Sequence, residues 1–130
     1  AASAEPLTRE GELVLTPQYA SPEQIAGRDV TTAADIYSLG VILFELLTGR
    51  RPHNQDTIQA LAMAVLNEDA PRPSQVAPPD VARQLEGDLD TITLKALQKE
   101  PGDRYLSAEQ LSEDIRRYLE DLPILASPDT

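Results

Sequence analysis

The sequence predicts an all-α protein in which about five helices surround one buried central helix. Aromatic residues make up only 4% of the 130 residues, so a core must be built mainly from Leu, Ile, Val and Ala, which favours helices over sheets. No segment shows a convincing strand pattern. The pattern of a helix start, a small polar residue followed three positions later by Gln or Asp, recurs four times. The four cases are Ser21…Gln24, Thr32…Asp35, Asp56…Gln59 and Ser107…Gln110.

The first two helix starts lead into different kinds of helix. Ser21 precedes Pro22, and proline is favoured at the first helical position because its missing N–H would be unpaired there anyway. The second start opens the segment AADIYSLGVILFELLTG, in which nearly every side chain is apolar. We therefore expect this central helix to be buried on nearly every side and to end at Gly49. A helix of this kind in so short a chain also suggests that more protein is meant to surround it.

The middle of the chain predicts a helix and then an extended connection. The spacing i, i+3, i+4, i+7, i+8 is typical of a helix with one buried face. It places Ile58, Leu61, Ala62, Val65 and Leu66 inward. Residues 70–79 contain four prolines, which predict a stiff, extended segment.

Two more helices are expected near the end of the chain. One covers residues 88–98, with Leu89, Ile92, Ala96 and Leu97 inward. The other follows Ser107, with Arg116 and Arg117 near the negative end of its dipole. Its inward residues are Leu111, Ile115, Tyr118 and Leu119. The first fourteen residues and the tail after Leu122 are expected to be loose.

Composition excludes several classes of function. Eleven Lys and Arg against 22 Asp and Glu give a formal net charge of −11, which argues against binding to nucleic acids or to anionic membranes. The absence of Cys and the presence of one His exclude zinc fingers, thiol nucleophiles and disulfides. No secretory signal opens the chain, and no apolar run approaches the ~18 residues of a membrane span. The expected compartment is the cytoplasm.

Three motifs occur in the order typical of one enzyme family. They are TPQYASPEQ (16–24), DIYSLG (35–40) and KEPGDRY (99–105), with LLTGRRP (46–52) after the central helix. In this order they resemble the C-terminal half of a bacterial serine/threonine protein kinase catalytic domain, over residues 13–119. Ser21-Pro22-Glu23 stands where that family has Ala-Pro-Glu at the end of the activation segment. The resemblance implies an all-α fragment of the α+β protein kinase fold.

The resemblance divides the chain into three parts and implies what a longer parent protein would supply. Residues 1–15 would be a flexible remnant of the activation loop, 16–122 an incomplete helical C-lobe and 123–130 a C-terminal tail. The sequence lacks the G-x-G-x-x-G, His-Arg-Asp and Asp-Phe-Gly motifs that place nucleotide, base and metal. ATP and Mg²⁺ are thus implied for the parent and no cofactor or metal for this chain, which alone should be inactive.

The resemblance implies two kinds of partner, the missing N-terminal part of the kinase domain and the protein substrates. Any membrane anchor of the parent would lie in segments not present here. Two other functions stay open, a pseudokinase scaffold and an unrelated helical interaction module. The second predicts that Glu23 and Arg104 lie far apart.

By resemblance, several residues would contact the substrate or the missing catalytic residues. Thr16 would bond to the catalytic Asp, although Leu15 replaces the usual Gly before it, and a solvated turn residue is the alternative. Leu13, Pro17 and Ala20 would line an apolar pocket for the substrate residue after the phosphoacceptor, or simply pack against the central helix. Glu45 matches an acidic position that meets a basic substrate residue in some kinases; the alternative is a helix carboxylate satisfied within the lobe.

The remaining site residues are structural or regulatory. Glu23 and Arg104 would form an ion pair across the lobe, with two exposed surface charges as the alternative. Asp35 would cap the central helix and hold the catalytic-loop backbone. Ile42 and Leu46 would form the floor under the apolar column that supports adenine. Without the rest of the domain that floor would be bare, which predicts self-association.

The residues before Thr16 offer hydroxyls for phosphorylation. Thr8 is a candidate, with Arg9 beside it, because a phosphate there could pair with Arg groups and order the loop. Ser3 and Thr16 are competing candidates.

Overall fold

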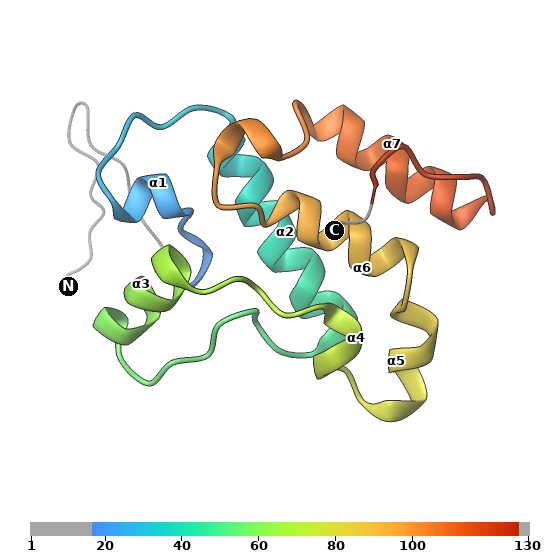
Figure 1. Cartoon of the computed structure of the whole chain (residues 1–130), viewed down its shortest axis with the longest axis horizontal. Helices are drawn as coiled ribbons and strands as arrows, with labels where there is room; N and C mark the ends of the chain where they lie inside the picture. Colours follow the sequence, from blue (N-terminus) through green and yellow to red (C-terminus); the bar gives the residue numbers. More distant parts are fainter. Residues whose placement is uncertain (1–16, 128–130) are drawn as a thin grey trace.

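The computed structural model describes residues 17–127 and places the other helices around α2 (Figure 1). This part of the chain contains helices and no strand, so the all-α prediction is confirmed for it. In chain order the elements are the 3-10 turn η1 (Pro17–Tyr19), α1 (Pro22–Ile25), α2 (Ala33–Thr48), α3 (Ile58–Asn67), α4 (Pro73–Val76), α5 (Pro79–Leu85), α6 (Asp88–Ala96), the 3-10 turn η2 (Pro101–Asp103) and α7 (Ala108–Leu119). The predictions made for Thr8, Leu13 and Thr16 lie outside the described residues.

Two apolar clusters form the core, one on each side of α2. Helices α1 and α3 lie on one side of α2, and α6 and α7 lie on the other (Figure 1). The α3-side core consists of Tyr37, Val41, Phe44, Leu61, Val65 and Leu97. The α7-side core consists of Ile36, Ile92, Ala96, Tyr105 and Leu111. Because α2 contributes to both, it is the element that joins the two halves of the lobe.

Helix α2 approaches α6 closely at Gly40. A Cβ atom at Gly40 would lie 2.9 Å from Cβ of Ala96 and 3.0 Å from Cδ2 of Leu97, closer than side-chain atoms normally pack. Glycine therefore allows the two helices to touch along their backbones.

The prediction that the central helix is buried on nearly every side was wrong for the described structure. Leu39 and Ile42 are exposed, and Leu46 is 79% exposed. The reason is that the described elements pack on two flanks of α2 and leave a third flank uncovered. The end of the helix was predicted correctly, since Gly49 caps it with a left-handed φ of 79°.

Two of the four predicted helix starts have a capping bond from the predicted residue. Ser21 Oγ accepts the Gln24 N–H at 3.3 Å and Gln24 Oε1 accepts the Ser21 N–H at 2.8 Å, which is a complete capping box with Pro22 at the first helical position. Ser107 Oγ accepts the Gln110 N–H at 3.1 Å. The Gln110 side chain, however, accepts the Leu106 N–H at 3.2 Å, so the second box is not reciprocal.

Of the other two helix starts, the one at Thr32 has the predicted position but lacks the capping bond, and the one at Asp56 is displaced by one residue. Thr32 has helical backbone angles and makes no capping bond, whereas Thr31 Oγ1 accepts a backbone N–H two residues later. Asp56 is replaced as the cap by its neighbour Thr57, whose Oγ1 accepts the Ala60 N–H at 3.0 Å. In both cases adjacent polar residues compete, and the sequence pattern cannot decide which of them has the extended backbone that a cap requires.

The proline-rich segment 70–79 was predicted to be extended, but part of it is helical. It contains α4 and the first residue of α5, each of which begins with a proline at its first helical position. Proline is well tolerated there because the helix leaves that N–H unpaired. The buried carboxylate of Asp90 on α6 also accepts the Ser74 N–H at 2.9 Å and so holds the first turn of α4.

The predicted inward faces of the last three long helices are mostly correct. The residues predicted inward on α6 are buried, which confirms that helix, although it ends at Ala96 rather than at residue 98. Ile58 and Leu119 are exposed, against prediction, because they are the first residue of α3 and the last of α7 and extend beyond the core.

The chain after Leu122 is not loose within the described residues, against prediction. Ile124 and Ala126 pack against the α7-side core. The backbone N–H groups of Leu125 and Ala126 donate to the carboxylate of Asp114 on α7. The tail to residue 127 is therefore part of the folded lobe.

Candidate functional site

The site is built around a buried ion pair between Glu23 on α1 and Arg104 after η2. Arg104 Nη1 donates to Glu23 Oε2 and Nη2 to Oε1, both at 2.7 Å, so the pair is bidentate. Glu23 is 1% exposed and Arg104 is 2% exposed. The parallel geometry fixes the orientation of both groups, which a lysine could not do. The alternative of two exposed surface charges is excluded, and so is the prediction of the unrelated helical module that these residues lie far apart.

Arg104 also bonds to three backbone carbonyls. Its Nε donates to the Gln98 carbonyl at 2.7 Å, Nη1 to Ala33 at 2.8 Å and Nη2 to Lys99 at 3.1 Å. These carbonyls lie at the end of α6 and the start of α2. One side chain therefore connects α1, α2 and the loop after α6, and its buried charge is compensated by acceptors on all sides.

The pKa values of Glu23 and of the neighbouring Tyr37 are both shifted from their ordinary values. Burial alone would raise the pKa of Glu23, but hydrogen bonds from Arg104, a backbone N–H and Ser21 hold this pKa below its ordinary value. The Arg104 guanidinium lies 5.1 Å from the ring centre of Tyr37 on α2. Burial raises the pKa of Tyr37 to about 12, so both groups keep a single protonation state near neutral pH.

An apolar pocket of about 230 Å³ lies beside the ion pair, between α1 and α3. Pro17 and Ala20, which were predicted to line a substrate pocket, both line this one. The residues of α3 that form the opposite wall were not predicted from the resemblance. The other lining residues are Gln24, Ile25, Ile58, Leu61 and Ala62. The ion pair holds α1, and α1 forms one wall, so the pocket depends on the ion pair for its shape.

Glu45 on α2 is bound within the lobe. Tyr19 Oη donates to Glu45 Oε1 at 2.9 Å, and Arg51 Nη1 lies 4.0 Å from Glu45 Oε2. The hydrogen bond to Glu45 raises the pKa of Tyr19. Ser38 Oγ donates to the Tyr19 carbonyl at 2.8 Å, which attaches η1 to α2. Both oxygens of Glu45 thus face groups of the chain itself, yet the weaker contact with Arg51 leaves one of them open to a competing cation.

The remaining predicted residues lie apart from this pocket. Asp35 is exposed, and within residues 17–127 its carboxylate has no hydrogen-bond partner, so the predicted capping bond is not formed. Ile42 and Leu46 lie together on the uncovered flank of α2. Both observations leave these side chains available to parts of a protein that the described residues do not include.

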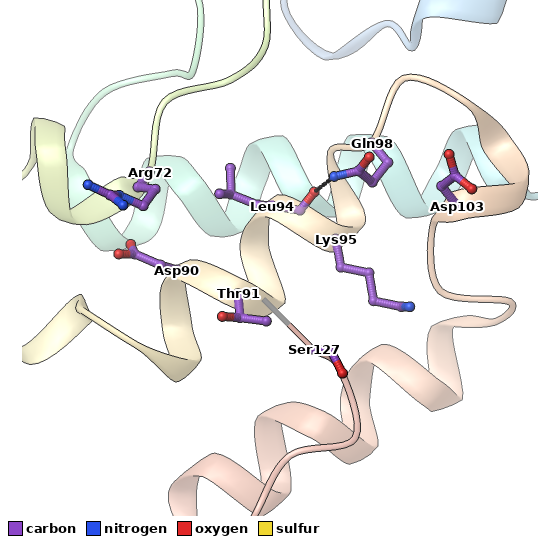
Figure 2. Close-up of a pocket in the computed structure, with 8 residues that line it drawn as sticks. All are labelled: Arg72, Asp90, Thr91, Leu94, Lys95, Gln98, Asp103 and Ser127. Carbon is purple, nitrogen blue, oxygen red and sulfur yellow. Dashed lines mark hydrogen bonds between the residues drawn. The ribbon is translucent and has the colours of Figure 1, made fainter. Parts of the chain in front are cut away.

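A larger pocket of about 530 Å³ lies along α6. Figure 2 shows its polar lining, with Arg72 and Asp90 at one end and Asp103 at the other. Charges of both signs line it, and the Asp90 carboxylate is already bonded to Ser74. This pocket has no feature that selects a particular ligand.

Neither a metal-ligand cluster nor a membrane-spanning helix is found among the described residues. Among residues 17–127, no three His, Cys, Asp or Glu side chains are grouped so as to hold a metal ion. No step is derived through the Mg²⁺ that the resemblance implies for the parent. None of the helices in the same range has both the length and the apolar character that a bilayer span requires.

Sequence reasoning missed Asp114 and Lys99. Asp114 is fully buried on α7 and binds Tyr105 and the tail. The Lys99 ammonium donates to the carbonyls of Val65 and Glu68 near the end of α3. A charged residue on the apolar side of a helix could have indicated Asp114, since it stands three residues after Leu111 and four before Tyr118, on their face.

Comparison with known proteins supports the motif assignment. The protein kinase domain family matches residues 1–115. The chain is 40% identical over 112 residues to the serine/threonine-protein kinase PknA of Corynebacterium glutamicum, covering 86% of the chain and 22% of that protein. It is 42% identical over 107 residues to PksC of Streptomyces coelicolor (82% and 18%) and 40% identical over 112 residues to PknD of Mycobacterium tuberculosis (86% and 16%), both named serine/threonine-protein kinases. The chain thus spans about a fifth of the length of these relatives, and it belongs to the protein kinase domain family.

Proposed function

We propose that the chain forms the substrate-docking lobe of a serine/threonine protein kinase, which transfers the γ-phosphoryl group of ATP to Ser and Thr side chains of proteins. The observation that carries the proposal is the bidentate Glu23–Arg104 pair, which holds α1 beside the apolar pocket. The names of the relatives support the reaction class. We expect the reaction to occur in the cytoplasm.

We propose that the catalytic groups come from a longer parent polypeptide. Phosphoryl transfer requires a metal, a nucleotide site and a base placed against the acceptor hydroxyl. The sequence contains none of the three motifs that supply them. The chain contributes binding and orientation, with Thr16 proposed to contact the catalytic Asp of the parent, and by itself it should transfer no phosphate.

The pocket beside α1 would bind the substrate residue that follows the phosphoacceptor. Its lining is mainly apolar, so an apolar substrate side chain is favoured, by about 1–3 kcal/mol for a methylene-scale change. A basic substrate residue on the other side of the hydroxyl would have to compete with Arg51 for Glu45. We therefore expect a stronger requirement for the apolar residue than for the basic one.

The test is a chimera in which residues 1–115 replace the matching segment of the Corynebacterium glutamicum relative. Transfer of radiolabelled γ-phosphate is measured with two peptides that differ only in carrying Leu or Ser after the phosphoacceptor. We expect the chimera to be active and to prefer the Leu peptide. We expect the isolated chain with Mg²⁺ and ATP to be inactive.

A matched pair of variants on α3 tests the pocket. Ala62 lines it, whereas the adjacent Met63 is exposed. Ala62→Glu should reduce the Leu preference of the chimera by about tenfold or more, and Met63→Glu should leave it unchanged. A folded but inactive chimera would favour the pseudokinase scaffold instead, and phosphate transfer by the isolated chain would contradict the proposed division of roles.

A further inference from the structure

The C-terminal tail supplies most of the hydrogen bonds of a buried carboxylate. Asp114 on α7 is 0% exposed. It accepts the Leu125 N–H at 2.7 Å and the Ala126 N–H at 3.0 Å, and the Tyr105 hydroxyl donates to it at 2.7 Å. A buried carboxylate is costly unless donors surround it. Within residues 17–127, two of the three donors to Asp114 belong to the tail, so the tail completes the site.

The chain reverses direction after α7 through a defined turn. Asp121 adopts a positive φ of 60°, and the Leu122 N–H donates to the Arg117 carbonyl at 2.8 Å. This is the pattern of a chain that leaves a helix through a left-handed residue. Arg117 Nη1 then donates to the Pro123 carbonyl at 3.1 Å. The turn directs residues 123–127 back along the lobe.

The tail binds as an extended segment with alternating side chains. Ile124 and Ala126 pack against the α7-side core, whereas Leu125 between them is 69% exposed. Alternation of this kind is the periodicity of an extended chain. Beyond them, Ser127 lies with Thr91 and Lys95 at the pocket on α6 (Figure 2). The tail therefore spans from α7 to α6.

Asp114 connects the tail to the loop that carries Arg104. Its partner Tyr105 is buried in the α7-side core, and the Lys95 ammonium lies 5.3 Å from the centre of the Tyr105 ring. Burial, reinforced by the hydrogen bond to Asp114, raises the pKa of Tyr105, so its hydroxyl stays a donor. Tyr105 is adjacent in sequence to Arg104, whose guanidinium binds Glu23 on α1. Tyr105 and Arg104, which are adjacent in sequence, thus connect the tail at Asp114 to the docking site at Glu23.

We propose that residues 123–127 form a strap, bound by α6, α7 and Asp114, that positions Arg104 for its bond to Glu23. The strap lies beyond the residues 1–115 that match the kinase family. In this arrangement, detachment of the strap loosens the Tyr105–Arg104 loop and, through it, α1. The segment that follows the lobe in sequence can then alter the substrate-docking site without contacting it. The coupling can be measured on the folded chain without any phosphate transfer.

Hydrogen exchange of the full 130-residue chain tests the strap. Ile124→Asp puts a charge on the packed side of the strap, and Leu125→Asp is its matched control on the exposed side. The readouts at α1 are the amides of Ala26 and Arg28, which donate to the carbonyls of Pro22 and Glu23. We expect Ile124→Asp to speed their exchange by about tenfold, the change that a coupling of ordinary size produces. Leu125→Asp should leave it unchanged.

Two further measurements separate coupling from general destabilisation. The amides of Leu61 and Glu68 on α3 serve as internal references, and their exchange should change much less than that of α1. In a Glu23→Gln background, Ile124→Asp should no longer add to the exchange of Ala26 and Arg28. An equal rise at all amides, or a change confined to the strap, would overturn the proposal.

If Ile124→Asp fails to fold, a truncated variant that ends at Leu122 provides a second test of the strap. A synthetic peptide of residues 123–130 is added to it in trans, and exchange at Ala26 and Arg28 is measured with and without the peptide. Restored protection supports the strap. No response to saturating peptide, or no folding with the peptide present, overturns it.

Discussion

Arg104 is the residue on which the largest number of separate segments depends. Its guanidinium binds Glu23 on α1, the Ala33 carbonyl at the start of α2 and the Gln98 and Lys99 carbonyls after α6. Only a planar group with several donors can meet acceptors in all these directions. Because both charges are buried, each is stabilised only while the other is in place.

Removing Arg104 should therefore leave an unpaired buried carboxylate. We expect Arg104→Met to lower the free energy of unfolding by about 3–5 kcal/mol. The control is Arg28→Met, because the Arg28–Glu100 pair is exposed, 3.8 Å long and expected to contribute under about 1 kcal/mol. Urea unfolding followed by circular dichroism measures both variants. Equal losses would contradict the assignment of Arg104 as a buried anchor.

The lowered pKa of Glu23 makes stability depend on pH in one direction. A carboxyl with a folded-state pKa below its unfolded value stabilises the fold above the unfolded value, here near 4.5. That contribution is lost as the pH falls from about 4.5 through the folded-state pKa. Glu113, whose pKa Arg116 lowers, acts in the same direction.

Glu23→Gln should accordingly reduce the loss of stability on acidification. Unfolding is measured in urea at a series of pH values from neutral to acid. We expect the difference between the original chain and the variant to be largest at neutral pH and to shrink below about pH 4.5. A difference that is constant across the series would show that ionisation of Glu23 is not involved.

At the scale of elements, the contact of α2 with α6 depends on the absence of a side chain at Gly40. This contact lies between the two core clusters, so the separation of the two helices affects both. The neighbouring Ala96 and Leu97 are buried and cannot move aside without disturbing the core. A glycine inside a helix ordinarily costs about 1 kcal/mol relative to alanine, which the close packing here must offset.

Gly40→Ala should be destabilising although alanine is the better helix former. A gain of about 1 kcal/mol in helix propensity is opposed by a clash that costs about 1–3 kcal/mol, so we expect a net loss. Gly102→Ala is the control, because a Cβ there would have no atom within 4 Å. Thermal unfolding compares the two. An unchanged or higher melting temperature for Gly40→Ala would show that α2 and α6 can separate freely.

At the scale of the whole molecule, the uncovered flank of α2 is the main exposed apolar surface near the centre of the lobe. It contains Leu39, Ile42 and Leu46. Contiguous apolar surface of this kind usually contacts another protein or a further part of the same one. In a complete kinase domain we expect the missing part to cover it. In the isolated chain a second copy could do so, against the repulsion of a net charge of −11.

The isolated chain is therefore expected to self-associate, more strongly as salt screens the net charge. Leu46→Glu should shift it toward monomer, because it places a charge at the most exposed of the three flank residues. Met63→Glu, at an exposed position on α3, should not. Sedimentation at several concentrations measures the association. A monodisperse monomer at high concentration would contradict this prediction.

Local sequence signals located most of the helices. The capping box at Ser21, the helix start at Ser107 and the stop at Gly49 were predicted, as was the buried face of α6. These signals act between residues at most four or five positions apart, so they can be found without knowing the fold. The Glu23–Arg104 pair, 81 positions apart, was expected only because the motifs resembled a kinase.

The sequence by itself determined that the chain is mainly helical, where its central helix ends and to which family it belongs. The tertiary structure alone decided that α2 has an uncovered flank, that residues 73–76 form a helix and that the tail binds Asp114. The reason is that burial and long-range hydrogen bonds depend on which distant segments lie against a residue. No pattern within a few helical turns contains that information.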